Sequence, residues 1–82
     1  MMPGMSLTTT VYRRESPTGP ETITVLASLD DEGAEIRVIH ERDGQVVEDT
    51  IPHYGPDPAT GRRWLDDHRA ACLADGYQVV DH

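Results

Sequence analysis

Hydrophobic and polar residues alternate along much of the first 51 residues, as they do in strands that bury one face. The alternation is strictest over residues 22–29, and it continues over residues 34–42 and 45–51. Residues 7–14 are rich in β-branched side chains and form a further candidate strand. Residues 15–21 contain two prolines and a glycine, which predicts a loop. The pattern therefore predicts an antiparallel meander of three to four strands.

Two turns set the expected strand register. Asp43-Gly44 is typical of a two-residue type I′ hairpin turn, and residues 30–33 form a four-residue turn. Both turns place the same alternating residues on one face, which we call the inner face and expect to be buried. The inner face comprises Ile23, Val25, Ala27, Leu29, Ala34, Ile36, Val38, His40, Val47, Asp49 and Ile51. The expected pairs across the second turn are Ile36 with Ile51, Val38 with Asp49 and His40 with Val47.

The stretch after the strands predicts the one long helix of the chain. Asp57 can cap this helix, Pro58 suits its first position, and Gly76 supplies the left-handed residue at which a helix ends. Apolar residues recur here every three or four positions, so one side of the helix should be buried. These residues are Trp64, Leu65, His68, Ala71, Cys72 and Leu73. With residues 77–80 as a short final strand at an edge, we predict a two-layer α+β sandwich.

The length and composition indicate one domain with a small core. The chain has 82 residues, of which 37% are hydrophobic, and a chain of this size buries only about 60% of its unfolded surface. We divide it into a flexible N-terminus, residues 1–6, and a single α+β domain, residues 7–82. The native start, Met1 or Met5, is left open.

The same composition favours a cytoplasmic protein without cofactors. Cys72 is the only cysteine, which excludes an internal disulfide and a cysteine-only zinc site. No apolar stretch approaches the roughly 20 residues that span a bilayer, and a signal peptide is not evident. Fifteen acidic residues against seven arginines and no lysine give a net charge of −8, which disfavours binding to phosphate backbones. We therefore expect no membrane association and no direct nucleic-acid binding.

Three polar residues are candidates for chemistry. His40 and Asp49 interrupt the expected inner face, and His68 lies on the helix side that should face them. If they met, they would suit a general base oriented by a carboxylate, or part of a metal site. We favour the alternative that they lie at the rim or satisfy one another in a small polar cluster. Cys72 is expected to be a small buried residue rather than a nucleophile. We predict no catalytic or metal site and keep a small enzyme as a distant alternative.

Acidic residues are concentrated in the hairpins. Residues 30–57 hold nine acidic residues and two arginines, so they account for −7 of the net charge of −8. One interpretation is a surface that binds a basic protein partner or imitates a phosphate backbone. Its candidate residues are Asp30, Asp31, Glu32, Glu41, Asp43 and Glu48. We favour the other interpretation, in which solvated turn residues keep a small domain soluble.

The face opposite the helix, which we call the outer face, carries a candidate interface. Leu26, Ile39 and Val46 fall on this face of adjacent strands, where a homodimer would cover them. Scattered apolar residues are also normal on a solvated face, so both interpretations stay open. The sequence predicts a small acidic, non-enzymatic protein-interaction or regulatory domain that forms a homodimer. The alternative is an acidic inhibitor, antitoxin-like or DNA-mimic protein that blocks a basic partner surface.

Overall fold

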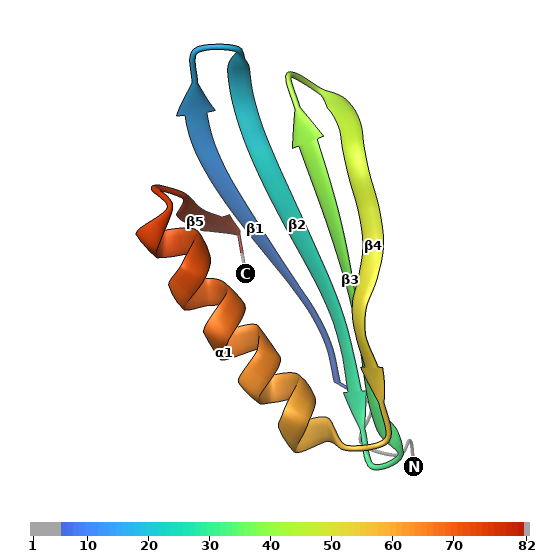
Figure 1. Cartoon of the computed structure of the whole chain (residues 1–82). Helices are drawn as coiled ribbons and strands as arrows, with labels where there is room; N and C mark the ends of the chain where they lie inside the picture. The colour runs from blue at the N-terminus through green and yellow to red at the C-terminus, as the bar shows by residue number, and fades with distance from the viewer. Residues whose placement is uncertain (1–5, 82) are drawn as a thin grey trace.

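The computed structural model describes residues 6–81, in which five antiparallel strands form one sheet and one helix packs on a single face (Figure 1). The elements are β1 (Ser6–Ser16), β2 (Gly19–Asp30), β3 (Gly33–Arg42), β4 (Gln45–Gly55), α1 (Pro58–Ala74) and β5 (Gln78–Asp81). The strand order is β4-β3-β2-β1-β5, which confirms the predicted α+β meander with a final edge strand. Most of the expected flexible N-terminus, residues 1–5 with both candidate start sites, lies outside the described residues. Ser6 already pairs with Leu29.

β1 and β2 form a long hairpin at the position where we expected a loop over residues 15–21. β1 continues to Ser16 and β2 begins at Gly19, so the turn contains only Pro17 and Thr18. Proline suits the second position of such a turn because its φ is fixed, and glycine at the fourth tolerates the observed φ of +114°. The Ser16 hydroxyl also donates to the Gly19 carbonyl over 2.7 Å. The loop prediction was therefore wrong.

The register between β2 and β3 confirms the first expected turn. The pairs include Ile23 with His40, Val25 with Val38 and Ala27 with Ile36. Burial follows the same alternation, since Val25 and Ile36 have exposed fractions of only 2% and 0%. A one-residue slip would turn these side chains to the opposite face, so their burial fixes the pairing.

The register between β3 and β4 differs from the one that we predicted. Two β-bulges place extra residues in β4, one next to the His40 pair and one between the Ile36 and Val38 pairs. The observed pairs are Ile36 with His53, Val38 with Thr50, Ile39 with Asp49 and His40 with Glu48. Asp49 therefore lies on the outer face, beside the side chain of Arg37.

The expected burial of the apolar residues in β4 is also wrong. Val47 and Ile51 have exposed fractions of 51% and 55%. The strand continues to Gly55 through Pro52, because an edge strand tolerates the missing N–H of proline on its unpaired side. β4 is thus an exposed edge, whereas the three strands beside it carry the core.

The helix begins and ends as its sequence predicts. The Asp57 side chain accepts a hydrogen bond from the Ala59 backbone N–H over 3.0 Å. At the other end, Gly76 has a φ of +94°, and its N–H donates to the Leu73 carbonyl. The N–H of Tyr77 donates to the Cys72 carbonyl over 3.0 Å, which completes a Schellman motif and aims Tyr77 back at the sheet.

Gly61 allows the helix to approach the sheet closely. It is buried, and a Cβ atom at this position would lie 2.5 Å from the Cβ of Ala34 and 3.0 Å from a methyl of Leu29. Only a residue without a side chain fits this approach. The glycine that weakens the helix in isolation is therefore a packing requirement in the fold.

The core lies between α1 and the inner face of β1, β2 and β3. Its buried cluster comprises Tyr12, Val25, Ala27, Ile36, Cys72 and Tyr77. Ala71 and Leu73 are exposed, so the buried side of the helix is narrower than predicted. A helix of 17 residues is about 26 Å long and a 12-residue strand about 40 Å, so the sheet extends beyond the helix at the β1–β2 and β3–β4 hairpins (Figure 1). In residues 6–81, no helix is long and apolar enough to cross a membrane.

Candidate functional site

Several polar side chains lie together around one buried carboxylate. Glu21 has an exposed fraction of 5%, and one of its oxygens, Oε2, contacts three groups. The Tyr77 hydroxyl donates to it over 2.9 Å, an Arg14 guanidinium N–H donates over 3.1 Å, and Nε2 of His40 lies 3.2 Å away. We call Arg14, Glu21, His40 and Tyr77 the Glu21 cluster.

Four different segments bring the Glu21 cluster together. The short turn of the first hairpin places Arg14 of β1 directly opposite Glu21 of β2. His40 of β3 lies two pairs further along, opposite Ile23 and on the same face as Glu21. The Schellman motif delivers Tyr77, and the Arg14 guanidinium lies 4.4 Å from the centre of its ring.

Arg14 also ties the end of the helix to the sheet. Its guanidinium donates to the backbone carbonyl of Asp75 over 2.7 Å and forms an ion pair of 3.2 Å with the Asp75 carboxylate. Asp75 is the C-cap of α1, so one arginine connects β1, β2 and the helix terminus. The carbonyl would otherwise be an unpaired group at the helix end.

The contacts shift the two acidic groups of the cluster in opposite directions. The hydrogen bond from Tyr77 and then those from Arg14 and His40 lower the pKa of Glu21 to about 2. Burial and the bond to the carboxylate raise the pKa of Tyr77 to about 12. At neutral pH such a carboxylate is a weak base and such a phenol a weak acid, so neither suits general acid–base catalysis. The arrangement is suited to holding four segments together.

The three residues that we considered for chemistry do not form one site. Asp49 lies on the outer face, where Arg37 donates two hydrogen bonds to its carboxylate, of 2.8 and 2.6 Å. This contact lowers the pKa of Asp49. His40 lies on the inner face and contacts Glu21. His68 belongs to a separate aromatic group on the helix, so His40, Asp49 and His68 do not form the polar cluster that we considered as one possibility.

His68 is held by aromatic and sulfur contacts. Its ring stacks on Trp64 with centroids 4.7 Å apart and meets the edge of Tyr12 at 5.8 Å. The Cys72 sulfur lies 3.7 Å from the imidazole nitrogens. Burial lowers the pKa of His68 and raises that of Cys72, which favours the neutral form of both. Cys72 is a free, buried thiol, which matches its expected place in the core.

Sequence reasoning missed Glu21 because it assigned this residue to a loop. The signal that would have found it is the turn sequence Ser16-Pro17-Thr18-Gly19, which fits a hairpin turn and sets Arg14 opposite Glu21. The contribution of Tyr77 depends on the three-dimensional return of the chain after Gly76, which no spacing in the sequence reveals.

The six acidic candidates do not form one continuous surface. Residues 30–32 lie at the β2–β3 turn, and Asp43 lies at the opposite end of β3, about 30 Å away along the strand. Glu48 pairs with His40, whose side chain lies on the inner face, whereas Glu41 is on the outer face opposite Val46. The negative charge is therefore divided between both ends and both faces.

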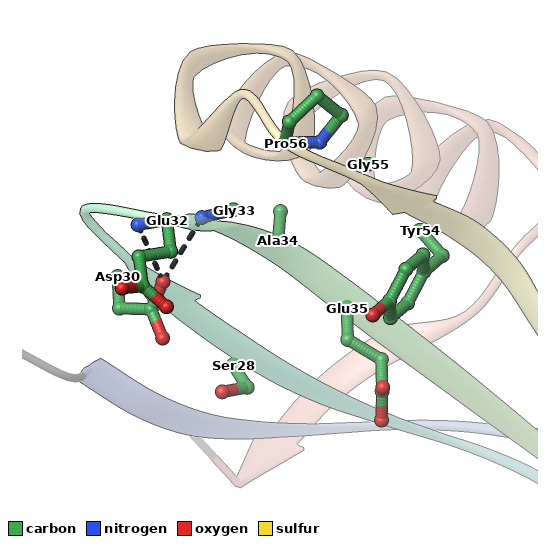
Figure 2. A pocket seen from close by; sticks show the side chains of 9 residues that line it. All are labelled: Ser28, Asp30, Glu32, Gly33, Ala34, Glu35, Tyr54, Gly55 and Pro56. Carbon is green, nitrogen blue, oxygen red and sulfur yellow. Dashed lines mark hydrogen bonds between the residues drawn. The ribbon is translucent and has the colours of Figure 1, made fainter.

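A polar cavity of about 500 Å³ opens beside the β2–β3 turn (Figure 2). Three of its lining residues are acidic, namely Asp30, Glu32 and Glu35, and the exposed ring of Tyr54 forms another part of its wall. The Asp30 carboxylate accepts hydrogen bonds from the backbone N–H groups of Glu32 and Gly33, so it stabilises the turn itself. Within residues 6–81, no group of three or more His, Cys, Asp or Glu side chains is arranged to hold a metal ion.

The three apolar residues proposed as an interface do share the outer face. Leu26 of β2 pairs with Arg37 and Val46 of β4 pairs with Glu41, so each is a diagonal neighbour of Ile39 in β3. Leu26 and Ile39 are half-buried, and Val46 is 60% exposed. No other element of the described chain covers this face.

Comparison of the chain with protein-family models, with curated proteins and with solved structures finds no match. Functional inference therefore rests on the fold and on the contacts described above.

Proposed function

We propose that this protein is a non-enzymatic protein-interaction domain that forms a homodimer through the outer face of its sheet. The observation that carries the proposal is that only one face of the sheet is covered. The helix α1 packs on the inner face, whereas the outer face carries the half-buried Leu26 and Ile39 and the exposed Val46. A small domain gains stability when a second copy covers such a face. The Glu21 cluster then serves to hold the sheet and helix in place.

The size of the outer face suits a dimer interface. Four strands about 4.8 Å apart and about 34 Å long present roughly 650 Å² in projection. A stable protein–protein interface buries about 800 Å² on each partner. The projected area of β1–β4 is somewhat below this value, and the relief of the side chains and the short strand β5 add to the area that a second copy can cover.

The charges of the outer face favour a second copy over a strongly basic partner. This face carries Arg13 and Arg37 as well as Glu35, Glu41 and Asp49. A two-fold interface presents the same surface twice, so it needs both signs of charge on one face. The outer face meets this condition, whereas the charged residues of the turns at residues 30–33 and 43–44 are all acidic.

Light scattering on a size-exclusion column tests the proposal. We expect the mass of a dimer for the wild-type protein and the mass of a folded monomer for Leu26→Arg and Ile39→Glu. Each substitution places a charge at the centre of the patch, where desolvation is costly. Because each copy carries a net charge of −8, moderate salt should strengthen the dimer by screening repulsion.

Leu73→Arg is the matched control, because Leu73 is an exposed leucine on the helix rather than on the outer face. It should leave the dimer intact. A wild-type monomer at all concentrations would contradict the proposal, as would equal dissociation by Leu73→Arg. Far-ultraviolet circular dichroism of every variant separates loss of dimerisation from loss of folding.

The second candidate is an acidic inhibitor or DNA-mimic function directed at a basic partner. The excess of acidic residues in residues 30–57 favours it, although their division between two ends disfavours one broad contact. Salt distinguishes the two candidates, since screening weakens capture of a basic partner and strengthens an acidic homodimer.

A further inference from the structure

The edge strand β4 combines an open backbone with exposed apolar side chains. β3 pairs with one side of β4, and no strand in residues 6–81 pairs with the other side. Every residue from Gln45 to Pro52 is exposed, and Tyr54 is 79% exposed. Free N–H and C=O groups along such an edge can bind a further strand.

The charge of β4 indicates which side chains an added strand should carry. The strand contains Glu48 and Asp49 and has no lysine or arginine. Asp49 is paired with Arg37, whereas Glu48 forms no side-chain hydrogen bond or ion pair within the described residues. Asp43 adds a further negative charge at the end of the hairpin. A lysine or arginine side chain on an added strand could therefore form an ion pair with the Glu48 carboxylate.

A second copy of β4 is a poor occupant of this edge. Pairing two β4 strands about a two-fold axis near Glu48 brings two Glu48 carboxylates towards each other, with no lysine or arginine in either strand to offset them. Like charges on facing strands are destabilising. The edge thus differs from the outer face, which carries both signs of charge.

We propose that β4 binds, as an added β-strand, a short extended segment of a partner protein in which apolar and basic side chains alternate. The apolar side chains would cover Val46 and its neighbours, and the basic ones would reach Glu48. Two bulges and Pro52 bend the edge and remove one donor, which limits pairing to roughly four to six residues. The edge shares Val46 with the proposed homodimer interface, but strand addition uses the unpaired backbone groups of β4 and does not depend on dimerisation.

Labelled hexapeptides test the proposal on the full chain. The probe alternates valine with arginine. One reference peptide alternates valine with glutamate, and the second is the arginine peptide with N-methyl groups on the backbone amides along one edge. We expect only the unmodified arginine peptide to bind in fluorescence anisotropy, with binding that weakens as salt increases. In amide-resolved NMR, the signals of residues 45–51 should shift and gain protection from hydrogen exchange.

Glu48→Gln should weaken the binding of the arginine peptide about twofold to fivefold, which is the range for the loss of one exposed ion pair. The matched control, Glu32→Gln, makes the same charge change at the distant β2–β3 turn and should leave binding unchanged. Equal binding of the N-methylated peptide, equal effects of the two variants, or absence of binding would each overturn the proposal. Protection of the β4 amides in the peptide-free protein that increases with its concentration would also overturn it, because a second copy would then occupy the edge.

Discussion

β3 and β4 belong to one hairpin but hold very different positions in the molecule. β3 has a strand on each side and the helix over its inner face, and Ile36 at its centre is fully buried. β4 has a strand on one side only, and Ile51 near its centre is more than half exposed. The difference shows that burial, rather than membership of the sheet, separates the stabilising part of this fold from the part that is free to meet partners.

The largest expected difference is between matched substitutions in the two strands. Ile36→Ala should lower the free energy of unfolding by about 2–5 kcal/mol, because it leaves a cavity in the core between the sheet and α1. Ile51→Ala should cost less than about 1 kcal/mol, since its side chain is mostly in water. Urea unfolding of both variants measures the difference. Equal losses would show that β4 is as tightly packed as β3.

The same contrast explains which parts of the fold the sequence predicts. Strict alternation in β2 and β3 has one solution that buries Val25 and Ile36, so pattern and turn length together determine the register. In β4 the alternating residues are exposed, so no loss of burial penalises a bulge, and the Asp43-Gly44 turn sets only the first two pairs. The helix was predictable because its caps and its periodicity are local.

Acid should weaken the contribution of the Glu21 cluster to the stability of the fold. The folded-state pKa of Glu21 is lowered from about 4.5 to about 2, so its ionised form stabilises the fold above pH 4.5. This contribution is lost as the pH falls from about 4.5 towards 2. The stability difference between wild type and Glu21→Gln should therefore be largest near neutral pH and shrink across this range. Thermal unfolding at a series of pH values measures it.

Asp49→Asn is the control for this measurement, because Asp49 is also ion-paired but lies on the exposed edge strand. Its pKa is lowered as well, so the sign of the effect is the same. Solvent screens the Arg37–Asp49 pair more strongly, so the pH-dependent difference should be smaller. A larger effect for Asp49→Asn than for Glu21→Gln would contradict the central role of the Glu21 cluster.

The Glu21 cluster also shows where prediction from sequence reaches its limit. The pairing of Arg14 with Glu21 follows from a short hairpin turn, but the prolines and the glycine in this stretch led us to predict a loop. Tyr77 joins the cluster only because α1 returns the chain to the sheet over a distance of 56 residues in sequence from Glu21. Local patterns carry no information about such contacts. His40, Asp49 and His68 do not meet, because one bulge in β4 places Asp49 on the opposite face of the sheet from His40.

The smallest expected difference comes from adding one methyl group at two glycines. In the helix, Gly61→Ala should destabilise the fold by about 1–3 kcal/mol, because its Cβ would lie 2.5 Å from that of Ala34. This sign is opposite to the usual gain of up to about 1 kcal/mol when alanine replaces a helical glycine. In β4, a Cβ at Gly55 would lie 3.9 Å from its nearest neighbour, a nitrogen of His53, so Gly55→Ala should change stability by less than about 0.5 kcal/mol. Urea unfolding of the two variants decides the matter: a stabilising Gly61→Ala would mean that the helix can move away from the sheet, and that the close approach of α1 to β2 and β3 is not required for the core.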